Sequence, residues 1–123
     1  MNEASMIGML STTISFGALL YLASIGELIS EKAGVLNLGV EGMMALGAVT
    51  GFLVALNTEN PWLALLVAMI VCATFALIHG IFSVILGAEQ VVSGLSLTFL
   101  GLGLSAFFGK SAVGRPPGAV LAP

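Results

Sequence analysis

The sequence predicts an all-α fold, a polytopic bundle of about four transmembrane helices, and three observations support this prediction. Hydrophobic residues make up 59% of the 123-residue chain, charged residues make up 7%, and the mean hydropathy is +1.16. Because a soluble domain carries roughly 25% charged residues, this chain could not cover a globule with a solvated surface. Four apolar runs also follow one another along the chain. Each is close to the length of about 20 residues that a helix needs to cross a bilayer.

Charge and cysteine content exclude other classes of protein. The net charge of −3 is small, and the three basic residues Lys32, Lys110 and Arg115 form no patch, so nothing indicates a nucleic-acid partner. The single cysteine, Cys72, lies inside an apolar run and cannot form an intramolecular disulfide. We therefore expect the chain to lie in a lipid bilayer.

The first predicted span covers residues 7–25, which contain no charge. Its serine and threonine hydroxyls can bond to carbonyls of the same helix or to a neighbouring helix. The charged segment 26–39 follows and breaks the apolar pattern; its first part, 26–34, ends in a glycine suited to a helix C′ position, Gly34. Irregular backbone is costly in hydrocarbon, so this break belongs at the membrane interface or in a protein-lined cavity.

The second predicted span covers residues 38–56. We expect Asn37 to cap its first turn and Glu41 to lie near the positive end of the helix dipole. Gly47 and Gly51 form a small-xxx-small pair that lets another helix approach closely. In a chain with 16 glycines, chance explains that pair equally well.

A clear turn precedes the third predicted span, residues 62–86. Asn60 is typical of an N-cap, Pro61 of a first helical residue, and Trp62 of an anchor at the membrane interface. A short polar turn, 87–90, separates it from the fourth predicted span, 91–108. The tail, 109–123, carries three of the four prolines and no closing helix, which favours an N-terminal fragment over a complete four-span protein.

Motifs of catalysis are not found in the sequence. There is no nucleophile triad, metal-ligand cluster or Walker-type phosphate loop, so we predict no enzyme, no metal site and no cofactor. His79 is the only histidine and lies inside the third span, where it could bond helix to helix or contact a substrate. Glu41 could be a first-turn carboxylate favoured by the dipole, or could face a polar pathway built around an interrupted helix.

Two blocks of the sequence resemble a known family. Residues 26–44 read GELISEKAGVLNLGVEGMM, and a second block reads LIHGIFSV at 77–84 and AEQVVSGL at 88–95. These blocks closely resemble the inner-membrane permease subunits of bacterial ABC importers. More narrowly, they are similar to the nucleoside/sugar branch, which is related to ribose and branched-chain amino acid permeases. The resemblance covers essentially the whole chain but only the N-terminal part of a typical permease.

The resemblance implies a multi-pass permease subunit of the bacterial plasma (inner) membrane that forms part of a translocation pathway for nucleosides or sugars. It implies three partners: an ATP-binding cassette ATPase subunit that hydrolyses the ATP, a second permease subunit, and an extracytoplasmic substrate-binding lipoprotein. It places the charged break in the cytoplasm and makes 109–123 a truncated extracytoplasmic loop. The positive-inside rule alone would favour the opposite placement, because the tail holds two basic residues, Lys110 and Arg115, and the loops hold one, Lys32. The residues that the resemblance points to for the substrate pathway or its support are Asn37, Glu41, His79, Gln90 and Ser93.

Two other functions are compatible with four spans. A small multidrug-type exporter depends on a membrane carboxylate, but such proteins carry it in the middle of the first span, and residues 7–25 have none. A non-transporting membrane scaffold would need no polar path at all. Alanine at Asn37, Glu41 and Gln90 would then leave uptake unchanged.

Overall fold

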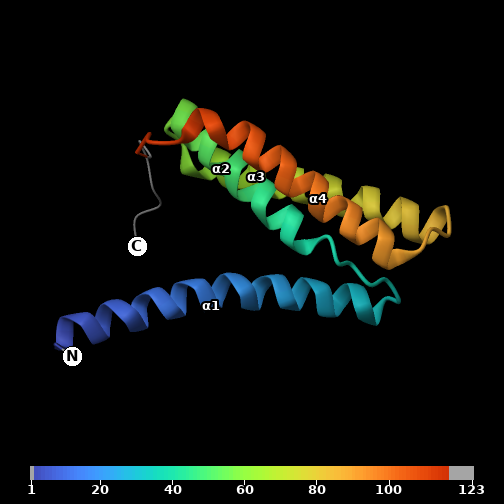
Figure 1. Cartoon of the computed structure of the whole chain (residues 1–123), viewed down its shortest axis with the longest axis horizontal. Helices are drawn as coiled ribbons and strands as arrows, with labels where there is room; N and C mark the ends of the chain where they lie inside the picture. The colour runs from blue at the N-terminus through green and yellow to red at the C-terminus, as the bar shows by residue number, and fades with distance from the viewer. Residues whose placement is uncertain (1, 117–123) are drawn as a thin grey trace. The chain divides into compact units, whose positions relative to one another are not determined.

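The computed structural model describes residues 2–116, and these residues form helices and no strand. Four stretches are long and apolar enough to cross a membrane: α1, α2, α3 continued by η1, and α4 continued by η2. The predicted all-α, four-span architecture is therefore confirmed. The chain forms two compact units, Met1–Gly34 and Val35–Pro123. In order, the elements are α1 (Glu3–Lys32), α2 (Val40–Thr58), α3 (Pro61–Gly80), the π-helix η1 (Ile81–Ile85), α4 (Gln90–Gly109) and the 3₁₀-helix η2 (Lys110–Ala112). Figure 1 labels the four α-helices.

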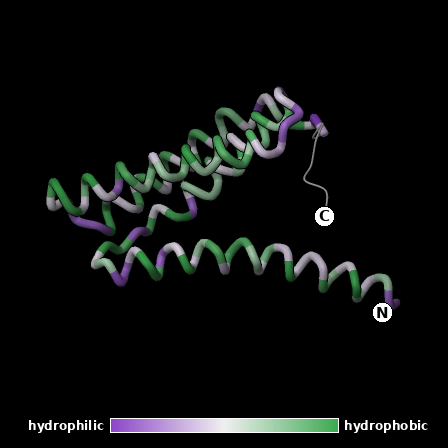
Figure 2. The backbone as a smooth tube through the Cα atoms, turned by 180° about the vertical axis from the view of Figure 1, so that it is seen from behind, coloured by the Kyte–Doolittle hydropathy of each residue, from purple (hydrophilic) through white to green (hydrophobic). Residues whose placement is uncertain are grey.

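Helix α1 is longer than the sequence predicted. The prediction ended the helix at Ile25, but it continues through Gly26 to Lys32. A single internal glycine costs only about 1 kcal/mol, and most of the residues that follow it are good helix formers. Gly34 has a φ of +89°, as expected for a helix C′ glycine, and its N–H donates to the Glu31 carbonyl. Figure 2 shows the hydrophilic residues of α1 near its two ends, with an apolar stretch between them.

Four hydroxyl groups of α1 bond within the helix. Each donates to a carbonyl four residues earlier, at 2.8–2.9 Å, and so is satisfied without water: Thr12 to Gly8, Thr13 to Met9, Ser15 to Ser11 and Ser24 to Leu20.

Helices α2 and α3 form an antiparallel pair (Figure 1). Asn60 caps α3 as predicted, accepting hydrogen bonds from the N–H groups of Trp62 and Leu63 at 3.1 and 3.2 Å. Gly47 and Gly51 lie where the two helices meet. A Cβ atom at Gly47 would lie 2.6 Å from the Cys72 sulfur, and one at Gly51 would lie 3.4 Å from the Ala68 Cβ. This part of the interface therefore depends on small residues.

Helices α2 and α4 run in the same direction and approach even more closely (Figure 1). A Cβ at Gly42 would lie 2.6 Å from the Leu97 carbonyl oxygen, and one at Gly101 would meet the backbone of Gly42. Two hydroxyls bond across this interface: Thr98 donates to the Leu38 carbonyl at 2.7 Å, and Ser105 donates to the Ala45 carbonyl at 3.1 Å. Close backbone approach and hydroxyl bonds are the usual means of holding helices together in lipid.

The third span is not a uniform α-helix. It runs from Pro61 to Ile85, but its last turn, η1, is a π-helix. The chain then turns at Gly87, whose φ is +62°, and α4 begins after Glu89. At the other end of α4, η2 occupies the first part of the predicted loop 109–123, of which 117–123 lie outside the described residues.

Candidate functional site

The segment 35–39 lies just before α2, and the carbonyl of its last residue, Gly39, accepts the first hydrogen bond of that helix, from the N–H of Met43 at 3.0 Å. Backbone groups without partners are costly in a membrane protein, so other parts of the chain must supply them. The N–H of Leu36 donates to Gln90 Oε1 at 2.7 Å, and the carbonyl of Leu36 accepts from His79 Nε2 at 3.0 Å. The carbonyl of Leu38 accepts from Thr98. We call the three side chains His79, Gln90 and Thr98 the clasp, because they hold segment 35–39 against α3 and α4.

His79 is the centre of the clasp and is only 2% exposed. A carbonyl oxygen only accepts, so Nε2 carries the proton that binds Leu36. In the neutral ring Nδ1 then accepts, and the Ser93 hydroxyl, 3.1 Å away, donates to it. This tautomer is assigned from the bonding network. The Ser83 hydroxyl also lies 3.3 Å from Nε2. One imidazole thereby joins α3, α4 and the segment before α2.

Four of the five predicted site residues meet here. His79 and Gln90 bond to Leu36, and Ser93 bonds to His79. Asn37 lies beside them, but the prediction that it caps α2 is wrong. Its Oδ1 accepts from the N–H of Gly39 at 2.9 Å, and Gly39, which has no side chain to donate or accept, is the N-cap.

Glu41 is the fifth predicted residue and takes part in none of the hydrogen bonds described above. It lies in the first turn of α2, as expected, with its side chain exposed. Whether any of the five residues contacts a substrate stays a prediction.

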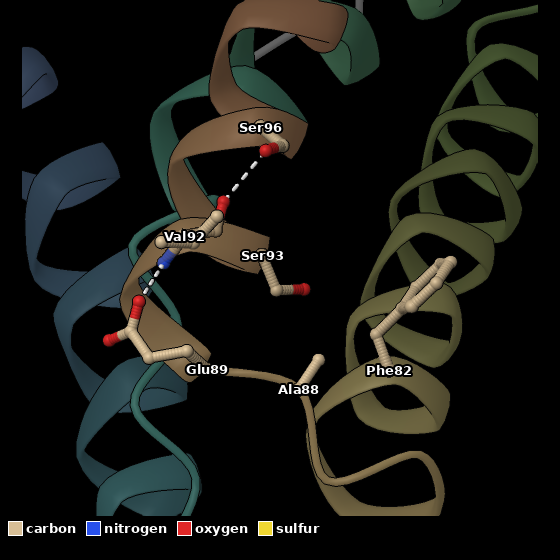
Figure 3. Close-up of a pocket in the computed structure, with 6 residues that line it drawn as sticks. All are labelled: Phe82, Ala88, Glu89, Val92, Ser93 and Ser96. Carbon is tan, nitrogen blue, oxygen red and sulfur yellow. Dashed lines mark hydrogen bonds between the residues drawn. The ribbon is translucent and has the colours of Figure 1, made fainter.

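A pocket of about 400 Å³ lies between η1 and the first turns of α4 (Figure 3). The hydroxyl of Ser93 extends from α4 toward η1, which carries Phe82. Ser93 therefore belongs to both the pocket wall and the His79 network. The remaining lining residues are Ala88, Glu89, Val92 and Ser96.

Sequence reasoning missed Thr98, Phe82 and Ser96. A usable signal existed for Ser96, because Glu89, Ser93 and Ser96 are spaced i, i+4, i+7 and so form a polar stripe on one helical face. No comparable signal marks Phe82, since its position depends on the π-helix.

Hydrogen bonding is the chemistry available at this site. The clasp and pocket contain hydroxyls, an amide, an imidazole and one carboxylate, that of Glu89. Within residues 2–116, no three His, Cys, Asp or Glu side chains are grouped so that they could hold a metal ion. The hydroxyls, the amide and the imidazole of this site suit the binding of a neutral polar molecule.

Residues 9–119 match the protein family described as "Branched-chain amino acid transport system / permease component". Individual relatives agree with this match. The chain is 48% identical over 106 residues to the permease protein TsgC13 of Haloferax volcanii, whose name provisionally assigns it to a glucose ABC transporter. It is 38% identical over 109 residues to the guanosine ABC transporter permease protein NupQ of Bacillus subtilis, and 34% identical over 94 residues to the nucleoside ABC transporter permease protein NupC of Lactococcus lactis.

These alignments cover 86%, 84% and 72% of this chain, but 32%, 34% and 30% of the respective relatives. The chain thus spans about a third of the length of the relatives it matches. No solved structure matches it.

Proposed function

Since the chain belongs to the permease-component family of branched-chain amino acid transport systems, we propose that it is part of the transmembrane permease subunit of an ABC-type importer for nucleosides or sugars. The observation that carries the proposal is the agreement among three relatives. All three are named as ABC transporter permeases, one for guanosine, one for nucleosides and one, provisionally, for glucose. Four helices able to cross a membrane are consistent with a multi-pass membrane protein.

The geometry supports a role in a polar pathway. Segment 35–39 is an interruption between hydrophobic helices, and transporters often build substrate sites where helices are interrupted. In this proposal Asn37, His79, Gln90 and Ser93 support the pathway by holding that segment. Glu41, exposed at the start of α2, is the member able to face the pathway directly.

The chemistry of transport is divided among partners in this proposal. The permease hydrolyses nothing, and an ATP-binding cassette ATPase subunit supplies the energy. A second permease subunit completes the pathway, and an extracytoplasmic lipoprotein delivers the substrate. The complex would reside in the plasma (inner) membrane, with segment 26–39 on the cytoplasmic side.

Uptake measurements test the proposal. The gene that encodes the chain is deleted and then restored, and cells are given isotope-labelled guanosine, glucose or leucine. We expect uptake of guanosine or glucose to fall on deletion, to return on complementation, and to require the ATPase gene of the same operon. Loss of leucine uptake alone would assign the protein to amino acids and overturn the nucleoside/sugar proposal, and unchanged uptake of all three would overturn the importer role.

A further inference from the structure

The proton on His79 Nε2 lies within reach of two acceptors. It is donated to the carbonyl of Leu36 at 3.0 Å, and the hydroxyl oxygen of Ser83 lies 3.3 Å from the same nitrogen. The other ring nitrogen, Nδ1, already accepts from Ser93. Because the N–H cannot point straight at two acceptors at once, the shorter distance assigns the proton to Leu36. Ser83 is therefore a second acceptor for the same proton.

The Ser83 hydroxyl differs from other hydroxyls on these helices. Thr74 in α3 and Ser96 in α4 each donate to the carbonyl four residues earlier, at 2.8 and 2.7 Å. Ser83 is 9% exposed and lies in the π-helix η1, and its partner within residues 2–116 is the His79 ring. Such π-helices are rare and occur mostly at functional sites. The Ser83 hydroxyl thus serves the imidazole rather than the helix backbone.

Segment 35–39 is held by polar contacts rather than by a packed core. Among its residues only Gly39, which has no side chain, is buried, and Leu38 is 41% exposed. The backbone of Leu38 lies directly on α4 at Gly94, where a Cβ would come within 2.7 Å of the Leu38 nitrogen. No side chain of α4 interlocks with the segment at that point. Segments with few buried apolar contacts are the ones that open most readily.

Opening of the segment would leave the His79 proton without Leu36. His79 is 2% exposed, and a buried donor without an acceptor makes a state roughly ten- to a hundredfold rarer. If the Nε2–H turns to Ser83, the ring keeps two hydrogen bonds, because Ser93 continues to donate to Nδ1. No proton is transferred, and the tautomer is unchanged. The Leu36 carbonyl is then satisfied by water that enters as the segment leaves.

We propose that segment 35–39 opens and closes against α3 and α4, and that Ser83 is a positioning residue that accepts the His79 Nε2–H whenever the segment is open. The closed state has the hydrogen bond from His79 to Leu36, and the open state replaces it with one from His79 to Ser83. This exchange of acceptors lowers the free energy of the open state. The inference goes beyond the proposed function, and only a use of the opening in transport rests on that function.

Amide hydrogen exchange of the full protein in lipid nanodiscs tests the inference. The reporter is the Leu36 amide, which is bonded to Gln90 in the closed state. Ser83→Ala removes the acceptor that the open state uses, so Leu36 should exchange about two- to tenfold more slowly, the equilibrium effect of one ordinary hydrogen bond. A serine that only braced the closed segment would give the opposite sign, because its loss would speed exchange.

Two further variants provide controls. Ser111→Ala is the same substitution at a hydroxyl that bonds to the Phe108 carbonyl, far along the chain from the clasp, and should leave exchange at Leu36 unchanged. His79→Ala removes the donor that Leu36 and Ser83 share. Adding Ser83→Ala to it should therefore have no further effect on the rate, as expected for two residues that act through one hydrogen bond.

Faster or unchanged exchange of Leu36 in Ser83→Ala would overturn the inference, and so would slowing by Ser83→Ala that persists in the His79→Ala background. Import is measured separately in cells. If opening is a step of transport, Ser83→Ala should slow import by a similar factor. Slowed exchange with import at the wild-type rate would support the role of Ser83 and remove the opening from the transport cycle. An unmodified protein that imports neither a nucleoside nor a sugar would refute the proposed function, while the exchange result would still decide the role of Ser83.

Discussion

Replacing Gly101 with alanine should separate α2 from α4. A Cβ at this position would lie 2.6 Å from the carbonyl carbon and 2.7 Å from the Cα of Gly42, whereas ordinary van der Waals contact begins at 3.4 Å. The nearest atoms all belong to the backbone, so no side chain can rotate away. The helices must move apart by roughly the missing distance of about 0.8 Å, which strains the hydrogen bonds that Thr98 and Ser105 make across the interface.

The free-energy terms decide the sign of the effect. Overpacking costs about 1–3 kcal/mol. Weakening two interhelical hydrogen bonds adds about 0.6 kcal/mol each, and the helix propensity of alanine over glycine returns about 1 kcal/mol. The last two contributions nearly cancel, so we expect Gly101→Ala to lower the free energy of unfolding by about 1–3 kcal/mol.

Gly103 provides the matched control, because it lies on the same helix and a Cβ there would have nothing within 4 Å. Gly103→Ala should therefore leave stability unchanged or raise it by up to about 1 kcal/mol. The assay is unfolding of the purified protein in mixed micelles by increasing sodium dodecyl sulfate, followed by circular dichroism. Equal stability of the two variants would refute the reasoning that backbone contact at Gly101 holds the helices together.

Three further perturbations follow from the hydrogen bonds. His79→Ala should cost about 1–3 kcal/mol because the Leu36 carbonyl loses its donor; amide exchange of segment 35–39 should speed up, and unchanged exchange would argue against the clasp. Thr98→Val removes the donor to Leu38 and should cost about 0.6–1.7 kcal/mol in the same unfolding assay. Its control, Thr74→Val, removes a hydroxyl that bonds only within α3 and should be near neutral; equal losses would contradict an interhelical role for Thr98. Asn60→Ala removes the N-cap of α3 and should cost about 1 kcal/mol. The amides of Trp62 and Leu63 should then exchange faster. Exchange of both amides at the wild-type rate would contradict the role of Asn60 as the cap.

Local patterns in the sequence were enough to find the four spans and the cap of α3. Hydropathy over about 20 residues and an Asn-Pro turn depend only on near neighbours along the chain, so they survive without any knowledge of packing. The same local reasoning was wrong where the free-energy difference between continuing and ending a helix was small. The predicted first span ended at Ile25, whereas α1 continues to Lys32, because one glycine is too weak a signal to stop a helix of 30 residues.

The site itself was decided by tertiary structure. The resemblance to permeases singled out Asn37, His79, Gln90 and Ser93, but not what they bond to. The bonds from Leu36 to His79 and Gln90 and from Leu38 to Thr98 join residues 43, 54 and 60 positions apart. Such pairs depend on tertiary packing: glycines let α2 and α4 approach at backbone distance, and this brings Thr98 to the carbonyl of Leu38. Composition determined that the chain is a set of membrane helices, whereas close packing of particular small residues determined which polar groups meet, because hydrogen bonds act only over about 3 Å.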